Sequence, residues 1–177
     1  TVAMQSFEGL NIRACVAVAR HSGMRKSELV SHEQSHALCF SNVSFLIAGV
    51  LILRPTAQQL DSLTTADFLV ILPPPSKSDP FGIVWGSLPI YLPFRRERRN
   101  AAYLVSLLLK ARQNAAPNDP LFCRAEGVPL VHWFMAKLLQ AWLVHIGLTS
   151  AEAALYSFHS ARAHLACALA AAGRSVD

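Results

Sequence analysis

The middle of the chain limits the fold most strongly, because three short apolar segments lie there between longer segments with helical spacing. Residues 45–53 are apolar and rich in β-branched side chains, and Arg54-Pro55 follows them. Residues 67–72 have the same character and are stopped by three consecutive prolines, which lack the N–H that a central strand needs. With residues 83–92 as a third strand, the sequence predicts a small three-stranded antiparallel sheet.

Helical segments flank these strands on both sides. A final alanine-rich helix starts near Phe158 and runs to Gly173, and Gly147 is expected to end the helix before it. Apolar residues recur at near-helical spacing over 2–20, 24–30, 101–112 and 130–146. We therefore expect an α+β, predominantly helical fold, with helices around the small three-stranded sheet. Trp133 and Trp142 of the helix over 130–146 are expected in the core.

Length and composition favour a single domain with a substantial core over 1–177. The 177 residues are 53% hydrophobic and 15% charged, which excludes a disordered chain. The longest apolar runs, 45–53 and 165–172, are shorter than the ~18–20 residues that span a bilayer. No charged and apolar leader opens the chain, and the first residue is Thr1, so we expect a segment excised from a longer protein.

Cysteine usage favours an intracellular protein, and the charge suits an anionic partner without requiring one. The net charge is +5 and the sequence pI is about 9.3. The four cysteines are scattered without a Cys-x-x-Cys pair, which indicates free, mostly buried thiols rather than a disulfide framework.

A possible phosphate site lies at the start of the last helix. His159 and Arg162 are three residues apart and so share one helical face, on which the later positions Ala166 and Ala170 are small. Two cationic donors on one face suit a phosphate. An exposed histidine and arginine without a ligand are the alternative.

Other basic residues are candidates for binding an anion only if they lie near one another. Arg25 can form a local ion pair with Glu28, and Lys77 lies in the polar turn between the second and third strands. Each alone is most often a solvated surface residue. The run Arg95–Arg99 precedes the helix over 101–112, where positive charge opposes the helix macrodipole and a polyanion would make it tolerable.

His32-Glu33-x-x-His36 formally matches the zinc-protease pattern, with two histidines at i and i+4 and a glutamate between them. That chemistry would need a third ligand, and no downstream Gly-x-x-His supplies one. A chance match in a connecting loop is the stronger interpretation.

Four motifs in order resemble the catalytic domain of the tyrosine recombinase (phage integrase) family. Residues Gly23–Leu29 (GMRKSEL) resemble the family's Gly-Leu-Arg-x-Ser-Glu-Leu box, and Lys77 is similar to the lysine of its β-turn. Pro120–Leu130 resembles the link into the following helix, and His159–Arg162 (HSAR) resembles the His-x-x-Arg box. The resemblance spans nearly the whole chain.

The resemblance implies cleavage of double-stranded DNA by a tyrosine, through a 3′-phosphotyrosyl intermediate that is resolved by a 5′-hydroxyl, without metal or other cofactor. Arg25 and Arg162 would clamp the phosphate, His159 would hydrogen-bond it, and Lys77 would protonate the leaving oxygen. It also implies a homo-oligomer assembled on DNA, no membrane partner, and a location with DNA, in a nucleus or a bacterial cytoplasm.

The chain departs from the family pattern at the nucleophile. The family's tyrosine follows the His-x-x-Arg box, whereas Tyr91, Tyr103 and Tyr156 all precede it. The family's N-terminal DNA-clamping domain has no counterpart either. We therefore expect residues 1–177 alone to be inactive, and a catalytically inactive DNA-binding relative is the alternative. A zinc metalloprotease built on His32, Glu33 and His36 is a more distant one.

Overall fold

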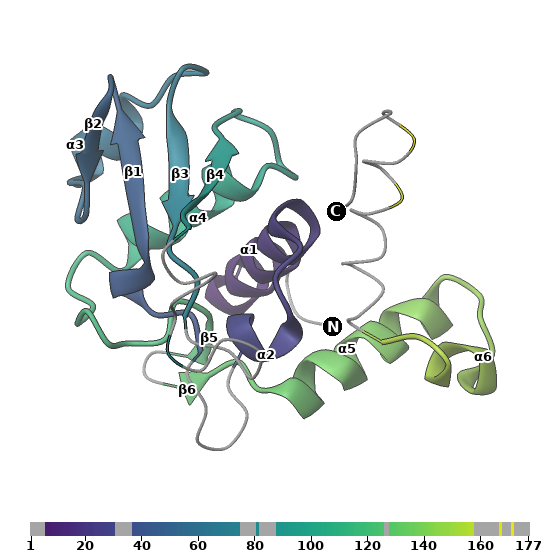
Figure 1. The fold of residues 1–177 in the computed structure, drawn as a ribbon. Coiled ribbons are helices and arrows are strands. Elements are labelled where there is room, and N and C mark those ends of the chain that lie inside the picture. The colour runs from purple at the N-terminus through teal and green to yellow at the C-terminus, as the bar shows by residue number, and fades with distance from the viewer. Residues whose placement is uncertain are drawn as a thin grey trace.

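The fold is α+β, with α1 at its centre (Figure 1). The computed structural model describes residues 6–30, 37–74, 81, 88–125, 128–157, 167 and 171. In chain order the elements are α1 (Phe7–Ser22), α2 (Lys26–Leu29), the 3-10 helix η1 (Phe40–Asn42), β1 (Val43–Ile47), β2 (Val50–Ile52), α3 (Ala57–Asp61), β3 (Phe68–Ile71), β4 (Ile90–Pro93), α4 (Ala101–Ala111), β5 (Cys123–Ala125), β6 (Val128–Pro129), α5 (His132–His145) and α6 (Ser150–Ala154). The sheet of β1–β4 lies on one side of α1, and α5 and α6 extend on the other (Figure 1).

Helix α1 begins and ends at residues suited to those positions. The Ser6 hydroxyl accepts a hydrogen bond from the Gly9 N–H at 3.1 Å, which satisfies a first-turn donor. Gly23 follows the last turn in the left-handed conformation, with φ 67°, and its N–H donates to Ala19 O. A side chain is strained at that φ, so Gly23 determines where α1 ends.

The expected three-stranded sheet is wrong: the main sheet has four antiparallel strands in the order β2-β1-β3-β4. The apolar segment 45–53 is a hairpin rather than one strand, because Ala48 and Gly49 have φ of 49° and 81° and turn the chain back. Two left-handed residues match the type I′ turn that suits the twist of a hairpin. The strand predicted over 67–72 is confirmed as β3. Of the strand predicted over 83–92, the last residues belong to β4.

Four further elements, β5, β6, α3 and α6, lie in segments for which no helix or strand was predicted. A two-stranded sheet of β5 and β6 lies in the segment Pro120–Leu130, which was predicted only as a link into the following helix. Helices α3 and α6 lie in segments for which no helix was predicted, and each begins with a capping box, Thr56 with Gln59 and Thr149 with Glu152. These Thr-x-x-Gln and Thr-x-x-Glu pairs satisfy the first N–H groups of a short helix and were the sequence signal for it.

The core forms where the sheet, α1 and α4 meet. Buried side chains come from the sheet (Phe45, Leu69, Ile71, Leu92), from α1 (Ile12, Cys15, Val18) and from α4 (Leu104, Val105, Leu108). Helix α5 contributes only Met135 as a buried residue, and Trp133 is 58% exposed and Trp142 38%. The prediction that both tryptophans lie in the core is therefore wrong.

One buried carboxylate ties the hairpin to the sheet. Asp67 is 3% exposed and accepts hydrogen bonds from the Ala48 N–H at 2.8 Å, the Thr64 N–H at 2.7 Å and the Thr64 hydroxyl at 2.9 Å. Burial alone would raise the pKa of Asp67, but these hydrogen bonds outweigh it and hold the pKa below its ordinary value. The carboxylate therefore secures the left-handed turn of the β1–β2 hairpin from the start of β3.

We expect Asp67→Asn to lower the free energy of unfolding at neutral pH by roughly 1.5–3 kcal/mol, because an amide turns a donor toward N–H groups that need a charged acceptor. The folded-state pKa is lowered, so the wild-type contribution is present above the unfolded pKa of ~3.9 and is lost as the pH falls through the folded value. Urea unfolding at a series of pH values measures both effects.

The control is Asp61→Asn, since Asp61 is exposed and pairs with Lys110 on the surface, where a loss of at most ~1 kcal/mol is expected. A difference between wild type and Asp67→Asn that does not shrink in acid would contradict the role given to the carboxylate.

Candidate phosphate-binding site

The candidate site is built around Arg25, at the junction of α1 and α2. Met24 is buried beside it, and the Met24 N–H donates to the Ser22 hydroxyl at 3.2 Å. The Ser22 hydroxyl in turn donates to Val18 O at 2.7 Å, back inside α1. Arg25 itself is extended, with φ −71° and ψ 151°, and is the N-cap residue of α2. The sharp end of α1 at Gly23 therefore places the Arg25 backbone on rigid structure.

Glu28 holds both the backbone and the side chain of Arg25. Its Oε2 accepts from the Arg25 N–H at 2.7 Å, and its Oε1 lies 3.5 Å from Arg25 Nη1. The Arg25 side chain is 43% exposed and that of Glu28 is 12% exposed. The predicted ion pair is confirmed, but the contact with the backbone N–H was missed. A glutamate three residues after an N-cap position was the signal, because this is the acceptor position of a capping box.

This geometry suits Arg25 to an anion that arrives from solvent. A guanidinium keeps its charge near neutral pH and offers a planar set of donors that matches two oxygens of a phosphate. Glu28 restricts the freedom of the guanidinium, so less conformational entropy is lost when a ligand binds. What the site can do is bind and orient a phosphate. An exposed arginine cannot act as a general base.

Arg25 is the one member of the predicted four that lies within the described residues. Lys77, His159 and Arg162 lie outside them, and so do His32, Glu33 and His36 of the zinc-protease pattern. The grouping of Arg25 with the other three residues therefore stays a prediction. Within the described residues, no group of three or more His, Cys, Asp or Glu side chains could hold a metal ion.

The described tyrosines and cysteines differ in their exposure and so in their suitability as nucleophiles. Tyr91 and Tyr156 are about half exposed, whereas the Tyr103 ring packs edge-on against Phe94 with centroids 6.1 Å apart. None of the four cysteines is in a disulfide, and Cys15 and Cys123 are buried. Burial raises the pKa of the Cys15 thiol strongly, and burial with the nearby Asp119 charge raises that of Cys39. Neither thiol is suited to act as a nucleophilic thiolate.

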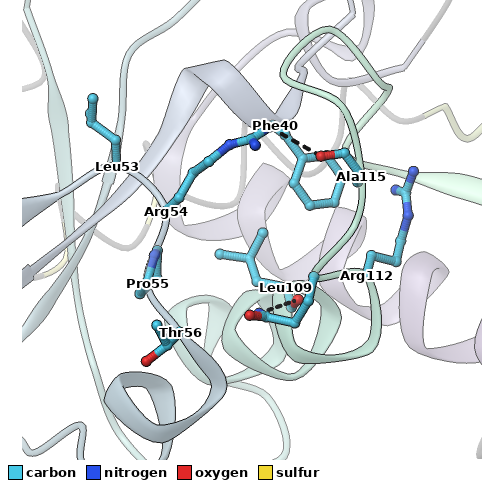
Figure 2. Close-up of a pocket in the computed structure, with 9 residues that line it drawn as sticks. Phe40, Leu53, Arg54, Pro55, Thr56, Leu109, Arg112 and Ala115 are labelled. Carbon is cyan, nitrogen blue, oxygen red and sulfur yellow. Dashed lines mark hydrogen bonds between the residues drawn. The ribbon is translucent and has the colours of Figure 1, made fainter.

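A small pocket of about 130 Å³ lies between the β2–α3 connection and the end of α4 (Figure 2). Its two arginines are engaged with the protein: Arg54 donates to Ala115 O at 3.0 Å, and Arg112 donates to Pro120 O at 2.8 Å and lies over the Phe40 ring. The lining contains no acid, histidine or cysteine (Phe40, Leu53, Arg54, Pro55, Thr56, Leu109, Arg112, Gln113, Ala115). The pocket therefore has no group for proton transfer near neutral pH.

The comparisons with known proteins give no family for the chain. A scan against protein families, a search of curated proteins and a search of solved structures each found no match. Among the described residues, no helix has both the length and the apolar character to cross a membrane.

We expect Glu28→Ala to lower the free energy of unfolding by about 1 kcal/mol, because the Arg25 N–H loses its acceptor. Glu28→Gln keeps a carbonyl oxygen for that N–H and loses only the charge next to the guanidinium, so it should cost clearly less. Urea unfolding of the three proteins measures the difference. Equal losses for the two variants would show that the backbone contact contributes nothing.

Proposed function

We propose that this chain is the phosphate-binding part of an enzyme that cleaves and rejoins DNA strands in site-specific recombination or integration, as in the tyrosine recombinases. The observation that supports the proposal best is the Arg25 unit: a glycine-ended helix, a buried Met24, and an exposed arginine held by Glu28. This is the segment in which the sequence resembles the family's first arginine box. The partner is double-stranded DNA, on which several copies of the chain would assemble.

In the proposed reaction a tyrosine attacks a backbone phosphate and a 5′-oxygen leaves. The transition state carries extra negative charge on the phosphate oxygens, and preorganised cations stabilise it. Arg25 and Arg162 supply those cations, and their planar donors match the oxygens better than a lysine would. His159 hydrogen-bonds the phosphate, and Lys77 gives a proton to the departing oxygen. No step requires a metal ion.

The nucleophile in this proposal does not come from residues 1–177. Tyr91, Tyr103 and Tyr156 all precede the His159–Arg162 motif, and the Tyr103 ring is packed on Phe94. The second candidate function follows from the same observation: a relative that holds DNA through phosphate contacts without cleaving it. A covalent protein–DNA adduct, formed on nicked duplex by a protein extended beyond Asp177, distinguishes the enzyme from the binding protein.

A zinc protease remains a third, weaker candidate for residues outside the described part. Zinc bound in a one-to-one ratio by the purified protein, and lost on His32→Ala, would favour it over a DNA enzyme.

We expect Arg25→Ala to weaken binding to duplex DNA and to reduce the slope of log K against log salt concentration by about one unit, because one phosphate contact is lost. Arg25→Lys keeps the charge and should recover most of the slope but less of the affinity, since the bidentate geometry is lost. Fluorescence anisotropy with a labelled duplex at several salt concentrations measures both.

Arg54→Ala is the matched control. It removes one exposed arginine whose guanidinium donates to Ala115 O, and should leave the slope nearly unchanged. Equal slopes for wild type and Arg25→Ala would mean that Arg25 does not contact DNA phosphate, and the proposed function would then lose its main support.

A further inference from the structure

We propose that Arg98 and Arg99, in the turn between β4 and α4, form a second surface that contacts the phosphates of duplex DNA. The inference rests on the proposed function and extends it, because these residues belong to none of the motifs that carry the resemblance. They are the last two arginines of the run Arg95–Arg99, which holds four arginines and one glutamate, a net charge of +3 in five residues.

The side chains of the first two arginines of the run form hydrogen bonds with other parts of the protein. Arg95 Nη1 donates to Thr65 O and to Phe94 O, each at 3.0 Å. Arg96 Nη2 donates to Asp61 O at 2.5 Å, and its guanidinium lies 6.0 Å from the centre of the Phe94 ring. These contacts tie the turn to the loop before β3 and to α3, so the turn is held from two sides.

The next two arginines have no such role. Arg98 and Arg99 are both exposed, and within the described residues neither side chain makes a hydrogen bond, an ion pair or a ring contact. The turn itself is ordered by the Asn100 N–H, which donates to Glu97 O at 3.0 Å. Asn100 also caps α4, with its side chain accepting from the Tyr103 N–H. The fold therefore presents two adjacent guanidinium groups to solvent from a fixed turn.

The electrostatics of this turn favour an anion. Helix α4 has 11 residues and no acidic side chain in its first turn, so the positive end of its dipole adds to the two guanidinium charges. Repulsion among these charges is offset when an anion lies against them. A duplex carries one negative charge per ~1.7 Å of its axis, so it can meet both side chains at once and release the counterions that it had bound.

Arg98 and Arg99 are both exposed, and within the described residues neither lies over an aromatic ring. An arginine can be retained for the contacts of its aliphatic stem. In this run, however, the arginine that lies near an aromatic ring is Arg96, over Phe94, and Phe94 in turn packs edge-on against Tyr103. Substitution of Arg98 and Arg99 should therefore leave stability unchanged, so that binding can be measured without a folding defect.

The test compares two double variants with the same net charge. Arg98→Gln/Arg99→Gln and the control Arg54→Gln/Lys137→Gln each remove two positive charges, from +5 to +3, and the control removes them from other exposed sites. We expect the first variant to reduce the salt slope of duplex binding by about two units, and the control by much less. Arg98→Lys/Arg99→Lys should keep most of the slope, because the slope depends on the number of positive charges that contact phosphates and lysine keeps that charge.

Each outcome has a definite meaning. If the two double variants bind duplex DNA with equal slopes, the Arg98–Arg99 surface is not a specific contact, while a slope that still depends on Arg25 would leave the proposed function standing. If wild type shows no salt-dependent duplex binding, both proposals fail. If the Arg98–Arg99 variant loses binding to vesicles of anionic phosphatidylserine but keeps its duplex slope, the surface meets a membrane and the inference is wrong.

Discussion

The packing of α1 is the constraint on which the rest of the structure depends. Eight of its residues are buried, and it contacts α4 and β5 as well as β4. A buried Asn11 adds a polar tie: its Oδ1 accepts from the Cys123 N–H at 2.9 Å, while its Nδ2 donates to Phe7 O inside the helix. Since an unpaired buried amide would be costly, this contact specifies how β5 lies against α1. The position of the last turn of α1 is then determined, and with it the position of Arg25.

Most of the differences between the predicted and the observed fold lie where a helix or strand ends or turns. The long helices and β3 could be recognised because apolar residues follow the period of each element over several turns or pairs. The hairpin of β1 and β2 could not be recognised, because its turn requires a positive φ at Ala48. Alanine rarely adopts such a φ, and no local sequence pattern predicts it. Its stabilising contact comes from Asp67, nineteen residues later in the chain. A local sequence pattern cannot predict a hydrogen bond between residues that are so far apart in the chain.

Helix α5 illustrates a second limit of sequence reasoning. Its apolar composition predicted that Trp133 and Trp142 lie in the core, but only Met135 is buried, and Trp133 contacts Phe134 and Lys137 at the surface. Composition indicates how much apolar surface a helix has, whereas burial depends on which neighbours cover it. The Arg25–Glu28 pair was predictable from i, i+3 spacing, because it is local. The prediction that Lys77, His159 and Arg162 lie beside Arg25 concerns tertiary structure, so it rests on the resemblance.

The account is tested most directly by an experimental structure of the chain bound to a DNA duplex. It predicts one backbone phosphate within hydrogen-bonding distance of the guanidinium groups of Arg25 and Arg162, with His159 and Lys77 beside the same phosphate. A complex in which Arg25 faces away from His159 and touches no phosphate would contradict it.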